Sequence, residues 1–522
     1  MSLFNKRKKT TQKNTRADKP KNEFIASVAE ETKRSYEETA AEMKAIKEQL
    51  GIPYKVYCRK QLYKKTRPDI ERYALAYHRR KMINEEKMQI VAEQQGITIA
   101  DVRQAIKDLN GDDRVKIKIN AENYEHYGMF LMDSQELYGL TERLAQVKTA
   151  AEELKPIINR VRNAELPYET IADDVKKMYS LVEKTMTPYL RSKLLEELSD
   201  LEPGLAQDPE RAETIPVDVE VARLFLDAKP TEYKTYHLYE ADFKGKLDYI
   251  FDEERKAYSK AINSQKITDT VNNKYNFYNK FKPLFSRDMI VVNSMDDYET
   301  FKDFVTKHPE FVIKPLSTSF GEGVGLERVE PGQDIRAYLQ SLLEERKTFL
   351  LEERIIADPR FAAFNEDSVN TVRIIVYYDG ETAFPLRATF RAGRQGSFVD
   401  NAGSGGIVAS IDVETGRFNS DGGDENGFRY TEHPESHSRF RDFQVPEWDK
   451  AIALVKDAIA SMGEPCIIGW DLALNDRQEW VIVEGNCRPQ YTQQGPLGYG
   501  VGPMVREVLR ENPCKAFASD VL

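Results

Sequence analysis

Between residues 23 and about 225, hydrophobic residues recur every three or four positions, which is the spacing of one face of an α-helix. The first such face is formed by Ile25, Val28, Tyr36, Ala40, Met43, Ile46 and Leu50. The pattern predicts a mostly α-helical N-terminal region over residues 23–225, to which the sequence assigns no role.

One helix pair is predicted within this region, over residues 86–111. Gly96 would make the turn, Thr98 would cap the second helix and Gly111 would close it. The outline is that of a DNA-binding helix-turn-helix, but many structural helix pairs share it. The second helix carries few basic or amide side chains for base edges, which favours the structural reading.

Two changes of pattern follow. Residues 199–218 are acidic and contain prolines, which predicts a linker. Beyond residue 280 short apolar runs alternate with glycine turns, and helices are expected near 334–346 and 445–462. The expected strands are 311–315, 325–330, 348–355, 368–378, 381–393, 405–413, 466–474 and 479–486. Asp379-Gly380 is a hairpin signal, and the region is predicted to be α+β with antiparallel sheets.

The composition is that of a soluble globular protein, with 522 residues of which 40% are hydrophobic and 31% charged. No run approaches the ~18 consecutive apolar residues of a membrane span, and no apolar segment follows the basic N-terminus as in a signal peptide. The four cysteines are too widely spaced to predict a disulfide framework or zinc site. His433 and His437 are interpreted as surface-loop residues, not metal ligands. We expect a cytoplasmic protein.

Charge is unevenly distributed. The first 21 residues carry a net charge of +7, so the remainder carries −17. A basic arm could contact anionic lipid weakly or bind nucleic acid, but a solvated, disordered tail over residues 1–22 is the favoured reading. The acidic body argues against nucleic-acid binding by the rest of the chain.

The last two strands carry a cluster of oxygen-bearing side chains. Alternation along a strand predicts that Ile482, Glu484 and Asn486 share one face. A four-residue turn at 476–479 would place Asp471 directly opposite Glu484, with β-carbons ~5 Å apart. Such ligands suit Mg²⁺, whose usual companion is a nucleotide. The alternative is a pair of carboxylates neutralised by local arginines.

A second candidate element lies between two strands and is rich in small residues: Ser317, Thr318, Ser319, Gly321, Gly323 and Gly325. Small residues let backbone amides approach phosphate oxygens closely. The run lacks the GK[ST] ending of a Walker loop, no helix follows it, and by itself such a loop is more often a mobile hairpin. Lys314, at the end of the preceding strand, is placed to meet a phosphate oxygen.

Taken in order, the segments IKP, the glycine-rich loop, LLEE, RAGRQGSFVDNAGSGG, IGWD and EGN resemble the ATP-grasp superfamily over roughly residues 235–510. The spacing of Arg391, Asn401 and the pair Gly405-Gly406 is similar to that in its RimK-like ligases. SVNTVRI, VDNAGSGGI, IGWD and EGN look most like the sugar-transfer-associated branch.

The resemblance implies two α+β subdomains clasping a nucleotide, after a mostly α-helical region. The implied organisation is a basic tail at 1–22, helices at 23–225 and an ATP-grasp domain at 226–522, divided into a lid-bearing part, 280–350, and a metal-binding part, 351–522. Two departures stand out. Many relatives have an arginine where this chain has Gly469, and helices replace the domain that usually precedes the grasp.

Carried over position by position, the resemblance also implies roles for individual residues. ATP would be bound by Lys280, Lys314, the loop residues Ser317, Thr318, Ser319, Gly321, Gly323 and Gly325, and by Glu352 and Glu353. Magnesium, with manganese as a substitute, would be held by Asp471, Glu484 and Asn486. The catalytic set would be Arg373, Arg391 and Asn401, with Arg387 as a less secure third arginine. Arg488 and Gln490 could line the acceptor side.

The implied activity is that of an ATP-dependent carboxylate–amine ligase, which forms a C–N bond through an acyl phosphate and releases ADP and phosphate. The family suggests modification of cell-surface sugars or peptides. Its partners would be a small-molecule or peptide carboxylate and an amine, and the helical region could mediate oligomerisation. The alternatives are a phosphotransferase on the same fold and a non-catalytic ATP-binding interaction protein.

Overall fold

The computed structural model describes residues 23–202, 204–285, 287–316, 323–394, 396–397, 400 and 405–514. The chain divides into two compact units, Met1–Leu137 and Tyr138–Leu522, and each is described by itself. None of the helices in the described ranges has both the length and the apolar character needed to cross a membrane. All four cysteines are free, as the sequence predicts.

The described part of the first unit is helical, as expected. Its helices are α1 (Glu23–Thr32), α2 (Tyr36–Leu50), α3 (Tyr54–Arg59), α4 (Arg67–Gln95), α5 (Ile99–Asn110) and α6 (Ala121–His126), and α7 (Ser134–Arg162) runs across the boundary. Gly96 ends α4 with a φ of 63°, which a glycine adopts without strain. Thr98 caps α5 in a reciprocal capping box with Asp101. The predicted helix pair is therefore confirmed.

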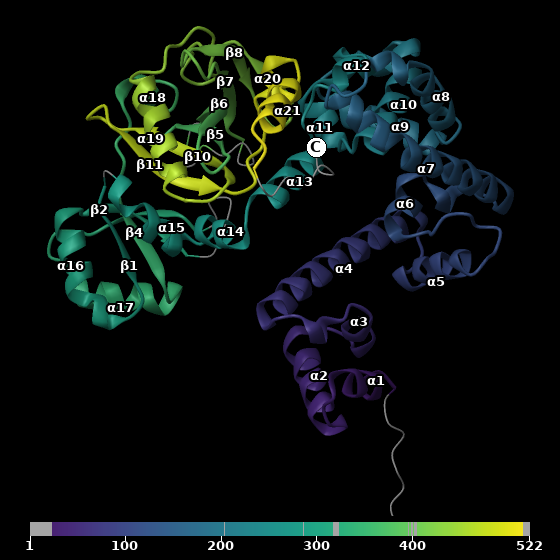
Figure 1. Ribbon diagram of the computed structural model, residues 1–522, viewed down its shortest axis with the longest axis horizontal. Coiled ribbons are helices and arrows are strands. Elements are labelled where there is room, and N and C mark those ends of the chain that lie inside the picture. The colour runs from purple at the N-terminus through teal and green to yellow at the C-terminus, as the bar shows by residue number, and fades with distance from the viewer. Residues whose placement is uncertain are drawn as a thin grey trace, which may run out of the picture. The chain divides into compact units, whose positions relative to one another are not determined.

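The second unit begins with further helices, which lie before the sheets in the sequence (Figure 1). They are α8 (Ala172–Glu183), α9 (Pro188–Ser199), α10 (Pro209–Leu226), α11 (Pro230–Thr235), α12 (Phe243–Lys246), α13 (Asp252–Ile262), α14 (Gln265–Asn272) and α15 (Lys274–Phe281). The prediction of a linker at 199–218 is wrong for its second half, which belongs to α10. Asp208 accepts hydrogen bonds from two backbone amides of α10, and Pro209 occupies the first turn, where proline is compatible with a helix.

A small antiparallel sheet follows, with strand order β1-β4-β2-β3. Its strands are β1 (Met289–Val292), β2 (Glu310–Pro315), β3 (Gly325–Arg328) and β4 (Phe349–Glu353). One face carries a core in which Phe311, Ile313, Phe349 and Leu351 meet the apolar sides of α16 (Tyr298–Lys307) and α17 (Ile335–Arg346). Because side chains alternate, Lys314 and Glu352 belong to the opposite face.

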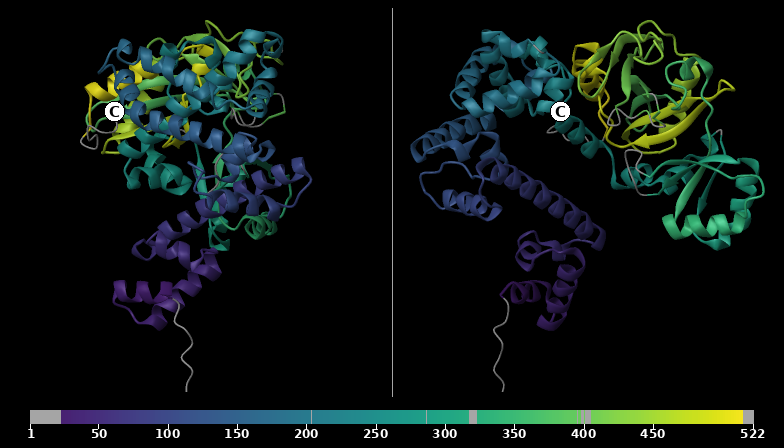
Figure 2. Two further views of the ribbon diagram at one scale, coloured as in Figure 1. Left: turned by 90° about the vertical axis from the view of Figure 1, so that its right-hand side faces the viewer. Right: turned by 180° about the vertical axis from the view of Figure 1, so that it is seen from behind.

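The large sheet is also antiparallel, with order β11-β10-β5-β6-β7-β8-β9. Its strands are β5 (Thr371–Tyr378), β6 (Ala383–Ala392), β7 (Ile407–Ile411), β8 (Phe418–Gly423), β9 (Arg429–Tyr430), β10 (Cys466–Leu474) and β11 (Trp480–Asn486). The remaining helices are α18 (Pro359–Ala362), α19 (Trp448–Ala460), α20 (Gln494–Leu497) and α21 (Gly502–Glu511). Figure 2 shows the two sheets from the side and from behind. The α+β antiparallel prediction is confirmed.

Both faces of the large sheet are covered over part of their area. On one face Trp470, Leu472 and Ile482 join a core that α19 completes. On the other, Ile375, Tyr377 and other apolar residues pack with α13 and α21. On the second face, Asp471 and Arg373 occupy the next alternating positions beyond the apolar end.

A buried ion-pair network joins three helices of this unit. Glu254 of α13 pairs with Arg162 of α7 and with Arg506 of α21, whose side chain is 2% exposed. Arg506 also donates to the carbonyl oxygens of Leu247 and Tyr249. Although burial opposes ionisation, the two guanidinium groups lower the pKa of Glu254 to about 2.

Replacing Glu254 by glutamine leaves two buried guanidinium groups without their carboxylate, so Glu254→Gln is expected to cost ~3 kcal/mol of unfolding free energy. Glu253→Gln, at a neighbouring exposed acid, is the matched control and should change stability by less than ~0.5 kcal/mol. Urea unfolding of both variants at pH 7 measures this.

The difference should also depend on pH. A carboxyl group whose folded pKa is depressed from 4.5 to about 2 stabilises the folded state above pH ~4.5, and this contribution is lost as the pH falls towards 2. The gap between wild type and Glu254→Gln should therefore narrow over that range. An unchanged gap would contradict the ion-pair account.

Candidate functional site

The hairpin of β10 and β11 brings Asp471 directly opposite Glu484, as the sequence predicts. The pairing nearer the turn differs from the expectation, because Trp480 pairs with Leu474 and not with Asn475. A β-bulge between Leu472 and Asp471 then shifts the register by one residue, which restores Glu484 as the partner of Asp471. The bulge places Val483 as the extra residue of β11. Asn486 lies two positions further, opposite Gly469.

The bulge also changes which side chains share a face. Ile482 is opposite Leu472 in the apolar core, whereas Glu484 is opposite Asp471 on the other face. The expectation that Ile482 and Glu484 point the same way is therefore wrong, because the extra residue reverses the alternation. Gly485 returns to the apolar side, where a β-carbon would lie 2.7 Å from Phe277.

Asp471 is buried, 2% exposed, and is held by two arginines. Arg373, opposite it on β5, donates from Nε and Nη2 to the two carboxylate oxygens, each at 2.6 Å. Arg391 of β6 donates to Oδ2 at 2.8 Å and pairs at 3.1 Å with Asp400. Although burial opposes ionisation, these guanidinium groups keep the pKa of Asp471 well below its usual range.

Glu484 has the opposite character. Desolvation and the adjacent Asp471 carboxylate raise its pKa, although Arg373 lies 4.0 Å away. The two carboxyl groups are within hydrogen-bonding reach of each other. Three carboxylates, those of Asp471, Glu484 and Asp400, thus share the guanidinium groups of Arg373 and Arg391. Two carboxylates and the Asn486 amide oxygen, which keeps a free lone pair beside its bond from the Arg488 amide, form a donor set that suits a hard divalent cation.

Gly469 explains one departure from the resembled family. It lies on the same face as Asp471, two residues before it, and an added β-carbon would meet Pro489 at 2.8 Å and Arg373 at 3.6 Å. Glycine at this position thus leaves room for Pro489 and for the Arg373 side chain. The guanidinium beside Asp471 comes from the neighbouring strand and not from position 469.

Facing this cluster is the polar side of the small sheet. Lys314 of β2 pairs with Glu352 of β4 at 2.8 Å, and Glu352 also pairs with Arg287 at 3.1 Å. Arg287 in turn donates to the carbonyl oxygens of Ile482 and Val483 at the bulge. Arg287 therefore links the small sheet to the edge strand of the large one.

Two lysines of α15, Lys280 and Lys274, contact different carbonyl groups. Lys280, an expected nucleotide ligand, donates to the Ser461 carbonyl after the end of α19. Lys274, which the sequence analysis did not select, donates to the Pro315 carbonyl at 3.0 Å. Burial first, then the charge of Lys314, lower the pKa of Lys274, and the carboxylates of Glu484 and Glu352 oppose that shift. Lys274, like Lys314, is thus within electrostatic range of Glu484.

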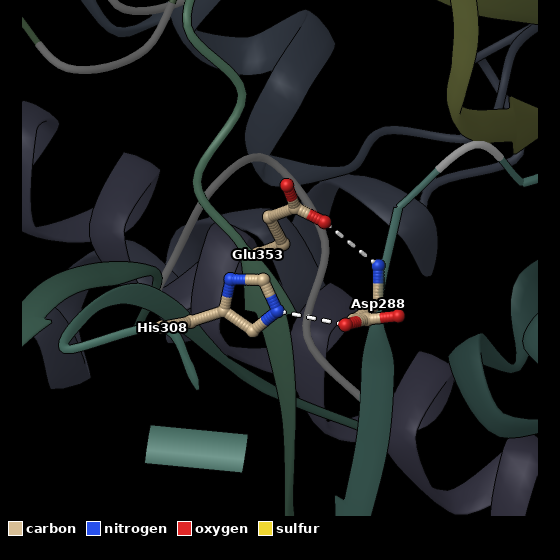
Figure 3. Close-up of side chains that lie close together, drawn as sticks. All are labelled: Asp288, His308 and Glu353. Carbon is tan, nitrogen blue, oxygen red and sulfur yellow. Dashed lines mark hydrogen bonds and ion pairs between the residues drawn. The ribbon is translucent and has the colours of Figure 1, made fainter. Parts of the chain in front are cut away.

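Glu353 lies on the other face of β4 and does not join Glu352. It accepts a hydrogen bond from the Asp288 backbone amide at 3.0 Å, and His308 lies 2.8 Å from the Asp288 carboxylate, as Figure 3 shows. These three residues are the one group of three or more acidic, histidine or cysteine side chains close enough for a metal in the described ranges. Lys307 also pairs with Asp288, so a local cation already neutralises this carboxylate.

Several predicted residues lie outside the described ranges: Ser317, Thr318, Ser319, Gly321 and Asn401. Of the loop, Gly323 is described, with a φ of 75° and a carbonyl oxygen that accepts from Arg346 at 2.9 Å. Gly325 begins β3 opposite Ile313.

The histidine interpretation needs one correction. His433 is fully buried and bonds the Gly393 carbonyl oxygen at 3.0 Å, so it is not a surface-loop residue. Its short polar segment folds inward to satisfy the end of β6. His437 is exposed, as expected.

Comparison with known proteins supports the ATP-grasp resemblance for the C-terminal half. Residues 253–509 match the family model described as sugar-transfer associated ATP-grasp. No curated protein matches the chain.

Solved structures similar to the chain include three ATP-grasp enzymes or their relatives. They are the ATP-grasp ligase PsnB complexed with minimal precursor (11% identity, TM-score 0.31, covering 48% of this chain and 64% of that one), N5-carboxyaminoimidazole ribonucleotide synthetase from Thermotoga maritima (12%, 0.26, 46% and 49%) and D-alanyl-alanine synthetase A from Vibrio cholerae (11%, 0.27, 47% and 62%). The chain spans less than two thirds of the length of each.

Lys274 and Lys280 provide a matched pair for testing which lysine meets the nucleotide. We expect Lys274→Met to weaken binding of Mg-AMPPNP at least ~10-fold, because it removes a cation beside Lys314. Lys280→Met should stay within about twofold, because its ammonium binds the Ser461 carbonyl after α19, whereas Lys274 interacts electrostatically with Glu484 and Glu352. Isothermal titration calorimetry measures both, and the reverse ranking would restore the role that the sequence gave to Lys280.

Proposed function

Because residues 253–509 form a sugar-transfer associated ATP-grasp domain, we propose that this chain is an ATP-dependent ligase that joins a carboxylate to an amine. The observation that carries the proposal is the cross-strand pair Asp471 and Glu484, under-neutralised and set beside Arg373 and Arg391. An arrangement of acids that lacks positive charge, next to guanidinium groups, is suited to a metal–triphosphate complex.

The residues are assigned as follows. Asp471, Glu484 and Asn486 would hold Mg²⁺, which would neutralise phosphate charge when bound. Lys274 interacts electrostatically with Glu352 and Glu484, and Lys314 interacts with Glu484. Both lysines would bind phosphate oxygens. Arg373 and Arg391 would stabilise the transferring phosphoryl group. Glu352 and residues 317–325 would complete the nucleotide site.

The proposed chemistry proceeds in two steps. An oxygen of the substrate carboxylate bonds to the γ-phosphorus while the bond to the β–γ bridging oxygen breaks, which gives an acyl phosphate and ADP. The amine nitrogen then bonds to the acyl carbon, the bond to phosphate oxygen breaks, and the amine proton passes to solvent. Negative charge grows on the phosphoryl oxygens in the first step, and Arg373 and Arg391 supply fixed positive charge there.

None of these steps requires a nucleophilic side chain of the protein. The acyl phosphate must instead be protected from water until the amine arrives. Closure of the loop at 317–325 over the phosphates would provide that protection. The helical region, residues 23–225, is proposed to precede the grasp at 226–522, with its later helices joined to the grasp through the Arg162–Glu254 ion pair.

The test incubates the full chain with Mg-ATP and pools of carboxylic acids, amino acids, peptides and nucleotide sugars, and follows ADP release and product mass. We expect ADP release that depends on both an acid and an amine. Glu484→Gln should lower turnover at least ~100-fold. Glu479→Gln, in the exposed turn of the same hairpin, should retain wild-type turnover.

Other outcomes would point elsewhere. A stable phosphorylated product without amine dependence would identify a phosphotransferase, and nucleotide binding without turnover would identify a binding protein. Full turnover by Glu484→Gln would remove the assignment of the metal site.

A further inference from the structure

Beside the proposed phosphate site, three buried polar atoms of one neighbourhood have no hydrogen-bond partner among the described residues. They are Nε of Arg387, the hydroxyl of Tyr491 and Nε2 of Gln493. Tyr491 is 2% exposed and Gln493 is fully buried. A buried donor without a partner destabilises the folded state, so three of them together need an explanation.

Their place on the large sheet is defined by the strand register. Arg387, Thr389 and Arg391 are alternate residues of β6 and share the face of Asp471. Thr389 is opposite Arg373 and donates its hydroxyl to Oε1 of Gln493 at 3.2 Å. Arg387 therefore lies one alternation, ~7 Å along the strand, beyond the position that faces Arg373.

The guanidinium of Arg387 carries a positive charge that no contacting carboxylate neutralises within the described ranges. Arg387 forms no ion pair within the described part of the chain, in contrast to Arg373 and Arg391. The titratable groups that act on its charge are Tyr499, Tyr491 and Asp412. Asp412 is occupied by the backbone amide and hydroxyl of Thr415 in a turn.

The unpartnered groups have a common chemistry. A guanidinium and an amide NH₂ only donate hydrogen bonds, and a tyrosine hydroxyl can donate as well. Their natural partner is a group that only accepts, and charge-assisted bonds from arginine to an oxyanion are among the strongest of that kind. Tyr499, 52% exposed, lies at the solvent side, and Arg387 is itself half-buried.

We propose that Arg387, Tyr491 and Gln493 form an anion-binding subsite for a carboxylate or phosphate group of the substrate, separate from the group that is phosphorylated. The inference rests on the proposed function, since it places this anion one step along β6 from the reacting centre. The substrate class is thereby narrowed to molecules that carry a second oxyanion. Tyr499 would cover it from the solvent side.

The test uses the full chain saturated with Mg-AMPPNP, so that the proposed nucleotide site is filled. Inorganic phosphate and acetate are titrated separately by calorimetry, which tells a phosphate-selective subsite from a carboxylate-selective one. We expect one probe to bind, Arg387→Gln to weaken that probe at least ~10-fold, and Arg387→Lys to restore part of the affinity. Arg417→Gln, at an exposed arginine 3.5 Å from Asp442, controls for the loss of one charge and should stay within twofold.

Chemical labelling of arginine provides a second readout that does not depend on an affinity measurement. Phenylglyoxal labels accessible arginines that are not ion-paired, and mass spectrometry of the full chain should find Arg387 modified and the bound probe protecting it. Arg373 and Arg391 should label less under the same conditions. If neither probe binds wild type, or if Arg387→Gln leaves binding unchanged, the subsite is refuted. Failure of Mg-AMPPNP to bind would instead refute the proposed function.

Discussion

The architecture of the site depends on how one buried carboxylate is neutralised. Asp471 is buried on β10, where an unpaired charge would be prohibitively expensive, and guanidinium groups from β5 and β6 make its ionised form favourable. The same two groups leave Glu484, its cross-strand neighbour, with insufficient positive charge. The proposed cation site rests on this asymmetry between the two facing acids, Asp471 and Glu484.

The β-bulge in β11 makes that asymmetry compatible with a packed core. Without the extra residue, Glu484 and Ile482 would share a face, and one of them would occupy the wrong environment. The bulge also alters the outer edge of the sheet, where Arg287 binds the carbonyl oxygens of Ile482 and Val483 and also Glu352. The bulge at Val483 thus turns Glu484 towards Asp471. It also presents the carbonyl oxygens that Arg287 binds, which joins the small sheet to β11.

Much of this arrangement could be predicted from the sequence, because it depends on local signals. Hydrophobic runs bounded by turns gave β10 its observed limits of Cys466 and Leu474, and the cross-strand partner of Asp471 was correct. The bulge was not predictable, since Val483 is neither a glycine nor a proline. The shorter pairing at Leu474–Trp480 and the extra residue Val483 shift the register by one residue in opposite directions, so Asp471 still faces Glu484.

The residues beside the site that sequence reasoning missed come from positions without a motif. Lys274 and Arg287 act through tertiary contacts with Pro315 and Glu352, and spacing along the chain carries no signal for such contacts. Lys280 had the more suggestive sequence context, but its helix directs it to the Ser461 carbonyl. The helix at 209–226 was missed because prolines at its start and interior resemble those of a linker.

The ion-pair network at Glu254 bears on how this chain should be dissected for expression. The family match begins at Glu253, yet Arg506 near the end of the match binds carbonyl oxygens of Leu247 and Tyr249, and Glu254 is shared with Arg162. A fragment cut at the family boundary would carry a severed salt bridge on its new surface. A soluble piece should therefore begin upstream of α7, so that the helix bearing Arg162 is retained whole.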